Sequence, residues 1–145
     1  MKNIALYIVA SMVILLIAGW FRFKRKPKKL KSTFYVTKWR SLQKLCADRK
    51  NWPDAVRQAD FLLDTALKKK RFKGKTMGAR LMAAQRQISD NDGIWAAHNL
   101  AKKIAEQTKA KKAIKLTKTE VKESLESFQA SLTDLGALRR APEKE

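Results

Sequence analysis

The sequence predicts an all-α protein in which a single N-terminal transmembrane helix precedes a small helical bundle of about five helices. Three observations support this fold class. The chain begins with a long uncharged apolar run, and apolar residues recur at helical spacing through the rest. Glycine and proline are scarce, at 5 and 3 of 145 residues. No segment shows the alternating pattern of a strand, so we expect helices throughout.

The predicted transmembrane segment lies between Lys2 and Arg22, where no charged residue occurs. A bilayer core about 30 Å thick needs about 20 apolar residues in a helix that rises about 1.5 Å per residue. Residues 3–23 meet that length, broken only by Arg22. Trp20 and Phe21 suit the interface between membrane and water. We therefore interpret residues 1–23 as an uncleaved anchor.

Two other interpretations of this run are possible. A buried core helix can be equally apolar, although it seldom lies at the extreme N-terminus. A cleaved signal peptide would end in small residues, whereas this run ends in Trp20 and Phe21 and enters a basic segment that resists translocation. The anchor remains the preferred interpretation.

A basic flank follows the apolar run and predicts its orientation. Positive charge near a membrane span stays in the cytoplasm, so we expect the N-terminus outside a bacterial cell membrane and the bundle in the cytoplasm. Basic residues beside a span also attract anionic lipid of the inner leaflet. The predicted lipid-binding residues are Arg22, Lys24, Arg25, Lys26, Lys28, Lys29 and Lys31.

The rest of the chain divides into a basic juxtamembrane linker at 24–32, a bundle at 33–138 and a polar tail at 139–145. The 33 Lys and Arg residues outnumber the 13 Asp and Glu residues, giving a formal net charge of +20. Such a charge governs what the surface attracts, which here means anionic partners. The single cysteine, Cys46, excludes an intramolecular disulfide, and its apolar neighbours predict a packed thiol.

Local signals place five helices in the bundle. Pro53 suits the first position of a helix, and Thr76 and Thr117 suit N-caps. Thr117 with Glu120 forms the capping-box pattern, and Gly136 is placed to close the last helix. The predicted ranges are about 33–48, 53–70, 77–88, 94–108 and 118–135. In the second of these, Asp60 and Asp64 fall between apolar positions. Paired carboxylates can act as a general acid and base or bind a metal, but with so many basic residues nearby we expect a solvated or salt-bridged face.

Three segments, at 52–67, 74–81 and 94–106, resemble a group of bacterial membrane-anchored proteins in which a HEPN-like helical bundle follows the anchor. The resemblance covers about Thr33 to Leu138. It implies that the domain dimerises and binds RNA, and that active members cut RNA with an Arg-x4-6-His motif. On this resemblance Trp95 and His98 match, whereas the arginine, asparagine and second histidine positions hold Ala101, Lys102 and Glu106.

These replacements predict a degenerate, non-catalytic domain. Metal-independent RNA cleavage needs a group for the 2′-hydroxyl proton and a cation for the phosphate. Ala101 supplies neither, and Glu106 is anionic and repels phosphate. The remaining histidine, His98, is expected to hydrogen-bond within or beside the core. No metal-ligand cluster or cofactor motif occurs, and the spacing of Gly74 and Gly78 lacks the rest of a phosphate loop.

The sequence therefore predicts a membrane-tethered, non-catalytic interaction or adaptor module with a protein partner or homodimer, and no small-molecule substrate. The alternative is an RNA-binding domain, and a divergent ribonuclease is a third. If the chain binds RNA, the basic residues at 68–75 and 102–118 would contact phosphates, and Phe72 is the candidate ring for stacking on a base. The residues predicted to bind nucleic acid are Lys68, Lys69, Lys70, Arg71, Lys73, Lys75, Lys102, Lys103, Lys109, Lys111 and Lys112.

Overall fold

The computed structural model describes residues 2–23 and 27–139, and every regular element in these ranges is a helix. The elements are α1 (Lys2–Phe23), α2 (Ser32–Leu45), a 3₁₀ turn η1 (Arg49–Asn51), α3 (Trp52–Lys69), α4 (Met77–Ala84), α5 (Asn91–Lys109) and α6 (Lys118–Asp134). The all-helical class and the five bundle helices are confirmed. The predicted tail at 139–145 lies, apart from Arg139, outside the described residues.

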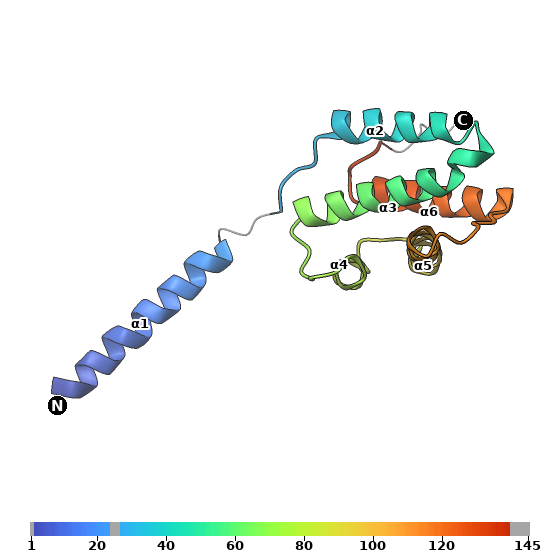
Figure 1. Cartoon of the computed structure of the whole chain (residues 1–145). Coiled ribbons are helices and arrows are strands. Elements are labelled where there is room, and N and C mark those ends of the chain that lie inside the picture. Colours follow the sequence, from blue (N-terminus) through green and yellow to red (C-terminus); the bar gives the residue numbers. More distant parts are fainter. Residues whose placement is uncertain (1, 24–26, 140–145) are drawn as a thin grey trace.

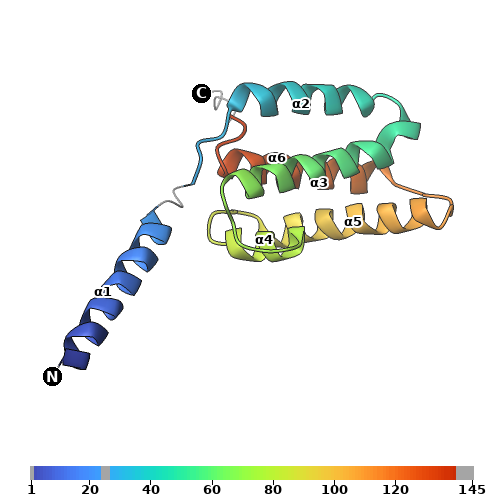
Figure 2. The same ribbon diagram turned by 60° about the vertical axis from the view of Figure 1, so that its left-hand side comes forward.

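The bundle has three layers, with α2 on one side, α3 and α6 in the middle, and α4 and α5 on the other side (Figures 1 and 2). Helix α3 is central, because it packs against α2, α4, α5 and α6. In Figure 1, α4 and α5 are seen nearly end-on while the other bundle helices lie across the view. Helix α3 therefore presents a different face to each neighbour, and its α5-facing side forms one wall of the candidate site.

The predicted transmembrane anchor is corrected by the structure. In the described part of the chain, no helix is both long enough and apolar enough to cross a membrane. The single-pass topology and the membrane localisation that were predicted from this run are therefore not supported.

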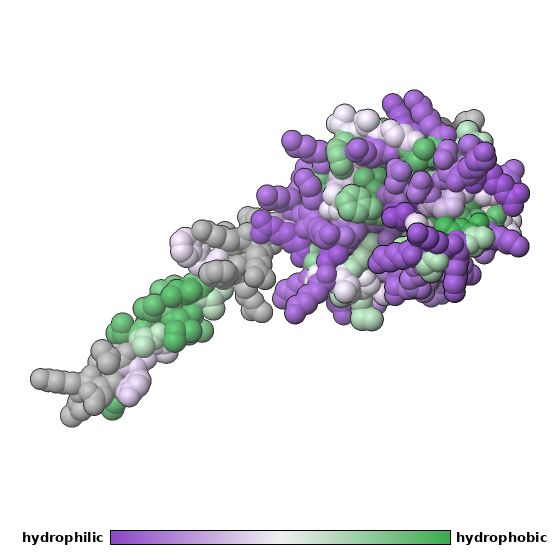
Figure 3. All heavy atoms as spheres, in the orientation of Figure 1, coloured by the Kyte–Doolittle hydropathy of each residue, from purple (hydrophilic) through white to green (hydrophobic). Residues whose placement is uncertain are grey.

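Helix α1 nevertheless differs sharply from the bundle in its surface. Its described apolar side chains are exposed, including Ile4, Tyr7 and Trp20. In Figures 1 and 2 it extends away from the bundle, and in Figure 3 it is mostly hydrophobic whereas the visible face of the bundle is mostly hydrophilic.

The core of the bundle follows the apolar stripes read from the sequence. The apolar stripe of α3 is buried throughout: Ala55, Val56, Ala59, Leu62, Leu63, Ala66 and Leu67. Tyr35, Trp39 and Leu42 bury one side of α2, and Phe128 and Leu132 bury one side of α6. Burial of these stripes between layers is what holds short helices in place, since most helices of this length are marginal alone.

Two helix boundaries differ from prediction. Helix α4 ends at Ala84 instead of continuing to residue 88, because Gln85–Gln87 form turns and Asn91 Nδ2 donates to the carbonyls of Gln85 and Ile88. Met82 lies on the outer side of this helix and is 62% exposed. Helix α5 begins earlier than predicted, because Asp90 caps it by accepting from Gly93 N at 2.9 Å.

The start of α6 carries the predicted capping box. Glu120 N donates to Thr117 Oγ1 at 3.2 Å, and Thr117 N donates to Glu120 Oε2 at 2.8 Å. Gly136 closes the helix with a φ of +77°, a left-handed conformation that favours glycine. The hydrogen bonds from the Thr117 backbone and side chain lower the pKa of Glu120, and nearby Lys103 lowers it further.

This lowered pKa predicts a pH-dependent contribution to stability. Because the folded pKa lies below the unfolded one, the contribution is complete above the unfolded pKa and is lost as pH falls through the folded pKa. The pKa of an unperturbed glutamate is about 4.3. Urea denaturation at neutral pH and at about pH 3 should therefore show a larger loss for the wild type than for Glu120→Gln. Equal losses in both proteins would contradict this role.

Candidate functional site

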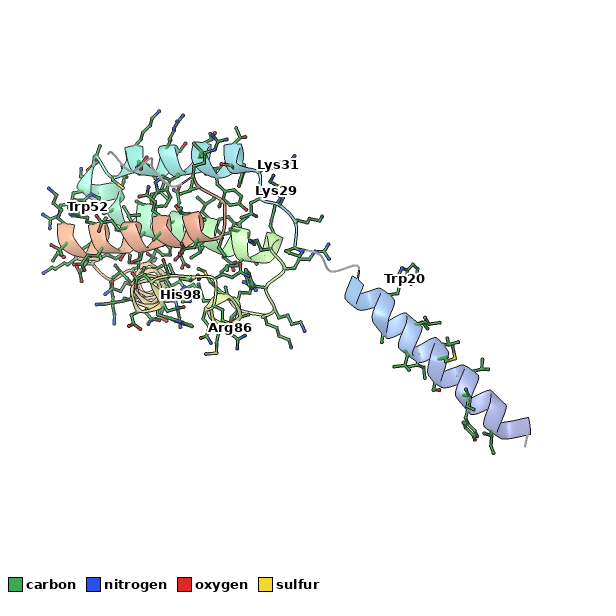
Figure 4. All side chains as sticks on the ribbon, turned by 180° about the vertical axis from the view of Figure 1, so that it is seen from behind. Trp20, Lys29, Lys31, Trp52, Arg86 and His98 are labelled. Carbon is green, nitrogen blue, oxygen red and sulfur yellow. The ribbon has the colours of Figure 1, made fainter. Side chains whose placement is uncertain are left out.

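Two basic segments far apart in the sequence meet at one end of the bundle. Leu30 is buried in the core and anchors Lys29 and Lys31 beside the start of α2. The α3–α4 connection leaves the adjacent end of α3 (Figures 1 and 2), and Figure 4 shows Lys29 and Lys31 at this end. We name the exposed lysines here the proximal cluster: Lys28, Lys29, Lys31, Lys69, Lys73 and Lys75. None of them forms an ion pair within residues 27–139.

The opposite end of the bundle carries a second basic group. Arg49 Nη2 donates to Leu116 O at 3.4 Å and so joins the α2–α3 connection to the α5–α6 connection. Trp52 marks this end in Figure 4. We name the exposed lysines here the distal cluster: Lys50, Lys109, Lys111, Lys112 and Lys115.

Some of the predicted basic residues also stabilise the fold. Lys68 Nζ lies 2.7 Å from Asp64 Oδ2, and Lys70 Nζ donates to Leu135 O at 3.2 Å. Arg71 adopts a left-handed φ of 64° just after α3, as Lys111 does after α5 with 52°. Cations at these two positions also complement the negative ends of the helix dipoles. Part of the positive charge at the two ends of the bundle is therefore explained by the way in which α3 and α5 end.

Part of the predicted lipid-binding set cannot be placed. Lys24, Arg25 and Lys26 lie outside the described residues, and the side chain of Arg22 does as well. Lys28, Lys29 and Lys31 are exposed and belong to the proximal cluster.

A groove of about 560 Å³ runs between α3 and α5. Its α3 wall carries Phe61, which is 70% exposed, and its α5 wall carries the small residues Ala101 and Ala105. The complete lining is Asp54, Arg57, Gln58, Asp60, Phe61, Asp64, Met77, Ala101, Lys102 and Ala105. The groove thus combines an aromatic ring, two small alanine side chains on the α5 wall, and charged groups.

Asp64 is held by a buried network beneath this groove. Its Oδ1 lies 2.6 Å from Arg80 Nη2 and accepts from Arg80 Nε at 2.7 Å. Arg80 Nη1 also donates to Gly74 O at 2.7 Å. Gly74 has a φ of +151°, and a Cβ there would lie 2.7 Å from Arg80 N, so a larger residue does not fit. The predicted salt-bridged role of Asp64 is confirmed, although the sequence did not single out Arg80 as its partner.

His98 pairs with Asp60, a second carboxylate of α3. Its Nδ1 lies 2.8 Å from Asp60 Oδ1, and its side chain is 9% exposed. Trp95 packs edge-on against the ring, with centroids 6.1 Å apart. A Cβ placed on Gly78 would lie 3.9 Å from His98 Nε2, so α4 covers that edge of the ring (labelled in Figure 4). The expected hydrogen bond beside the core is confirmed, and the buried ring is poorly placed to reach a ligand.

The other motif positions do not form a reaction centre with His98. Ala101 is buried at 3% exposure, whereas Lys102 and Glu106 are exposed on α5. Glu106 lies eight residues beyond His98, or about 12 Å along the helix axis. Cys46 Sγ donates to Leu42 O at 3.5 Å, and burial raises the pKa of its thiol, which disfavours the nucleophilic thiolate. This arrangement brings no nucleophile to the histidine among the described residues.

The structure reverses the prediction for the exposed aromatic ring. Phe72 is half-buried and packs against the core, so it is not a free stacking surface. Phe61 is the exposed phenylalanine of α3 instead, and the sequence contained a signal for this exposure. Phe61 follows Arg57 by four residues and Gln58 by three, which puts it on the polar face of the helix.

Comparisons with known proteins give no match to any family model, curated protein or solved structure. They therefore lend no support to the HEPN resemblance. The class of protein defined here is an all-helical bundle with basic clusters at both ends.

Proposed function

We propose that this bundle is a non-catalytic binding module whose basic clusters hold the phosphate backbone of RNA. The observation that carries the proposal is the proximal cluster, because the fold brings Lys28–Lys31 and the α3–α4 connection together, and no acidic residue within 27–139 pairs with the lysines of this cluster. Phosphate contacts of this kind give affinity that tolerates sequence and falls steeply with salt. The distal cluster offers a second contact about 27 Å away, the length of α3.

The same geometry favours binding over catalysis. His98 is covered by α4 and committed to Asp60, and the arginine position of the RNase motif is the buried Ala101. Neither residue can therefore act as a base on a phosphate backbone that the lysine clusters hold. An adaptor that docks a protein partner or a second copy is the competing role, and the next experiment separates the two.

We expect RNA affinity of the full chain to fall linearly with the logarithm of salt concentration. Each phosphate contact to a single strand contributes about −0.7 to the slope of log affinity against log salt. The triple variant Lys69→Gln, Lys73→Gln and Lys75→Gln should therefore flatten the slope by about 2. Fluorescence anisotropy with a labelled RNA across a salt series measures it.

The matched control removes three exposed lysines elsewhere, at Lys38, Lys44 and Lys122, and should change the slope less. Absence of RNA binding at about 50 mM salt, where such contacts are strong, would overturn the proposal. Recovery of a protein partner in that case would favour the adaptor role.

A further inference from the structure

We infer that the α3–α5 groove is a subsite for an unpaired nucleobase, which stacks on Phe61 while its phosphate meets Lys102 or Arg57. The inference rests on the proposed function and deepens it, because it makes single-stranded RNA the preferred partner. The lysine clusters by themselves do not distinguish a single strand from a duplex.

Phe61 supplies an accessible aromatic face. It is 70% exposed, while Phe72 packs on the core and Phe34 already contacts Tyr35 edge-on at 5.2 Å. The opposite wall is formed by Ala101 and Ala105, whose small side chains leave room for a flat ring. The volume of about 560 Å³ lies within the range of small-ligand pockets.

The cations around the groove, Arg57, Lys68, Arg80 and Lys102, outnumber the three aspartates. Asp64 is neutralised by Arg80 and Lys68, and Asp60 is hydrogen-bonded to His98, which adds a positive charge only when it is protonated. Asp54 lies 3.7 Å from Arg57, and both side chains are largely exposed, so this contact exchanges easily with solvent.

Lys102 is exposed at the edge of the groove and has no ion pair among the described residues. A phosphate in the groove therefore meets two cations: Lys102, which is unpaired among the described residues, and Arg57, which is weakly paired with Asp54.

The groove also lies within reach of the proximal cluster. Phe61 and Lys69 are both on α3, eight residues apart, which is about 12 Å along the axis. A strand whose backbone lies on the cluster can extend an adjoining base into the groove. Stacking on aromatic side chains is the usual means of holding single strands without sequence preference.

The test compares three labelled polyanions of equal length on the full chain: single-stranded RNA, an abasic sugar-phosphate strand and duplex RNA. Phe61→Ala should weaken binding of the single strand by about tenfold or more, the usual effect of losing one stacked base. Its affinity for the abasic strand and the duplex should not change. The salt slope should also stay the same, because stacking releases no counterions.

The outcomes separate this inference from the proposed function. Phe34→Ala serves as the matched aromatic control and should leave all affinities unchanged, and a thermal melt confirms that Phe61→Ala is folded. If Phe61→Ala leaves single-strand binding intact while the lysine triple variant weakens it, the subsite is wrong and the proposed function stands. If it weakens all three polyanions equally, the stacking role is also wrong. If the wild type binds none of them, the proposed function itself fails.

Discussion

Arg80→Met should lower the free energy of unfolding by about 3 kcal/mol, the lower end of the usual cost of breaking a buried ion pair. The Asp64 side chain is only 13% exposed and takes two contacts from this guanidinium. Without Arg80 it retains Lys68, whose side chain is 57% exposed and whose attraction is screened by water. The carbonyl of Gly74 also loses its donor. Urea denaturation gives the change directly.

Two further variants serve as controls for this prediction. Arg86→Met removes an exposed arginine nearby and should cost less than about 0.5 kcal/mol. The double variant Asp64→Asn with Arg80→Met should cost less than the sum of the single changes, because removing both charges leaves neither one buried alone. A change within about 0.5 kcal/mol for Arg80→Met would show that the network adds nothing to stability.

Phe128→Ala should be at least as damaging, at about 3–5 kcal/mol. Phe128 is fully buried on α6, the helix that packs against both α3 and α5. Truncation removes the apolar transfer energy of the ring and leaves a cavity that neighbouring helices fill only partly. The loss should appear as a lower urea midpoint at nearly unchanged m-value.

Phe61→Ala is the matched control for that experiment. It deletes the same side chain from an exposed position, so its cost should be within about 0.5 kcal/mol. A comparable loss in both variants would mean that Phe61 is packed in solution. That result would also remove the basis of the stacking subsite.

The individual bundle helices could be predicted because their signals are local. The N-caps at Thr76 and Thr117 and the αL glycine at Gly136 act within one turn of the chain. The apolar period of α3 likewise fixes which face is buried. The end of α4 could not be predicted, because it depends on hydrogen bonds from Asn91, a residue on the next helix.

The candidate site was predicted only in part. The basic segments could be recognised by composition, but their position at the same end of the bundle could not, because it depends on the burial of Leu30 in the tertiary core. The ring expected to be exposed, Phe72, is half-buried, whereas Phe61 is exposed, because sequence proximity to lysines does not reveal which ring packs in the core. The anchor inferred from the N-terminal run is not supported by the described helix.

By itself the sequence determined an all-helical chain, its caps and its strong positive charge, since these depend on neighbouring residues or on composition. Only the tertiary structure decided which charges and rings remain available. Packing of α4 and α5 on α3 buries Arg80 and His98 beside two carboxylates, and leaves Phe61 and Lys102 facing an open groove. The physical reason is that burial depends on contacts between helices, which no local pattern specifies.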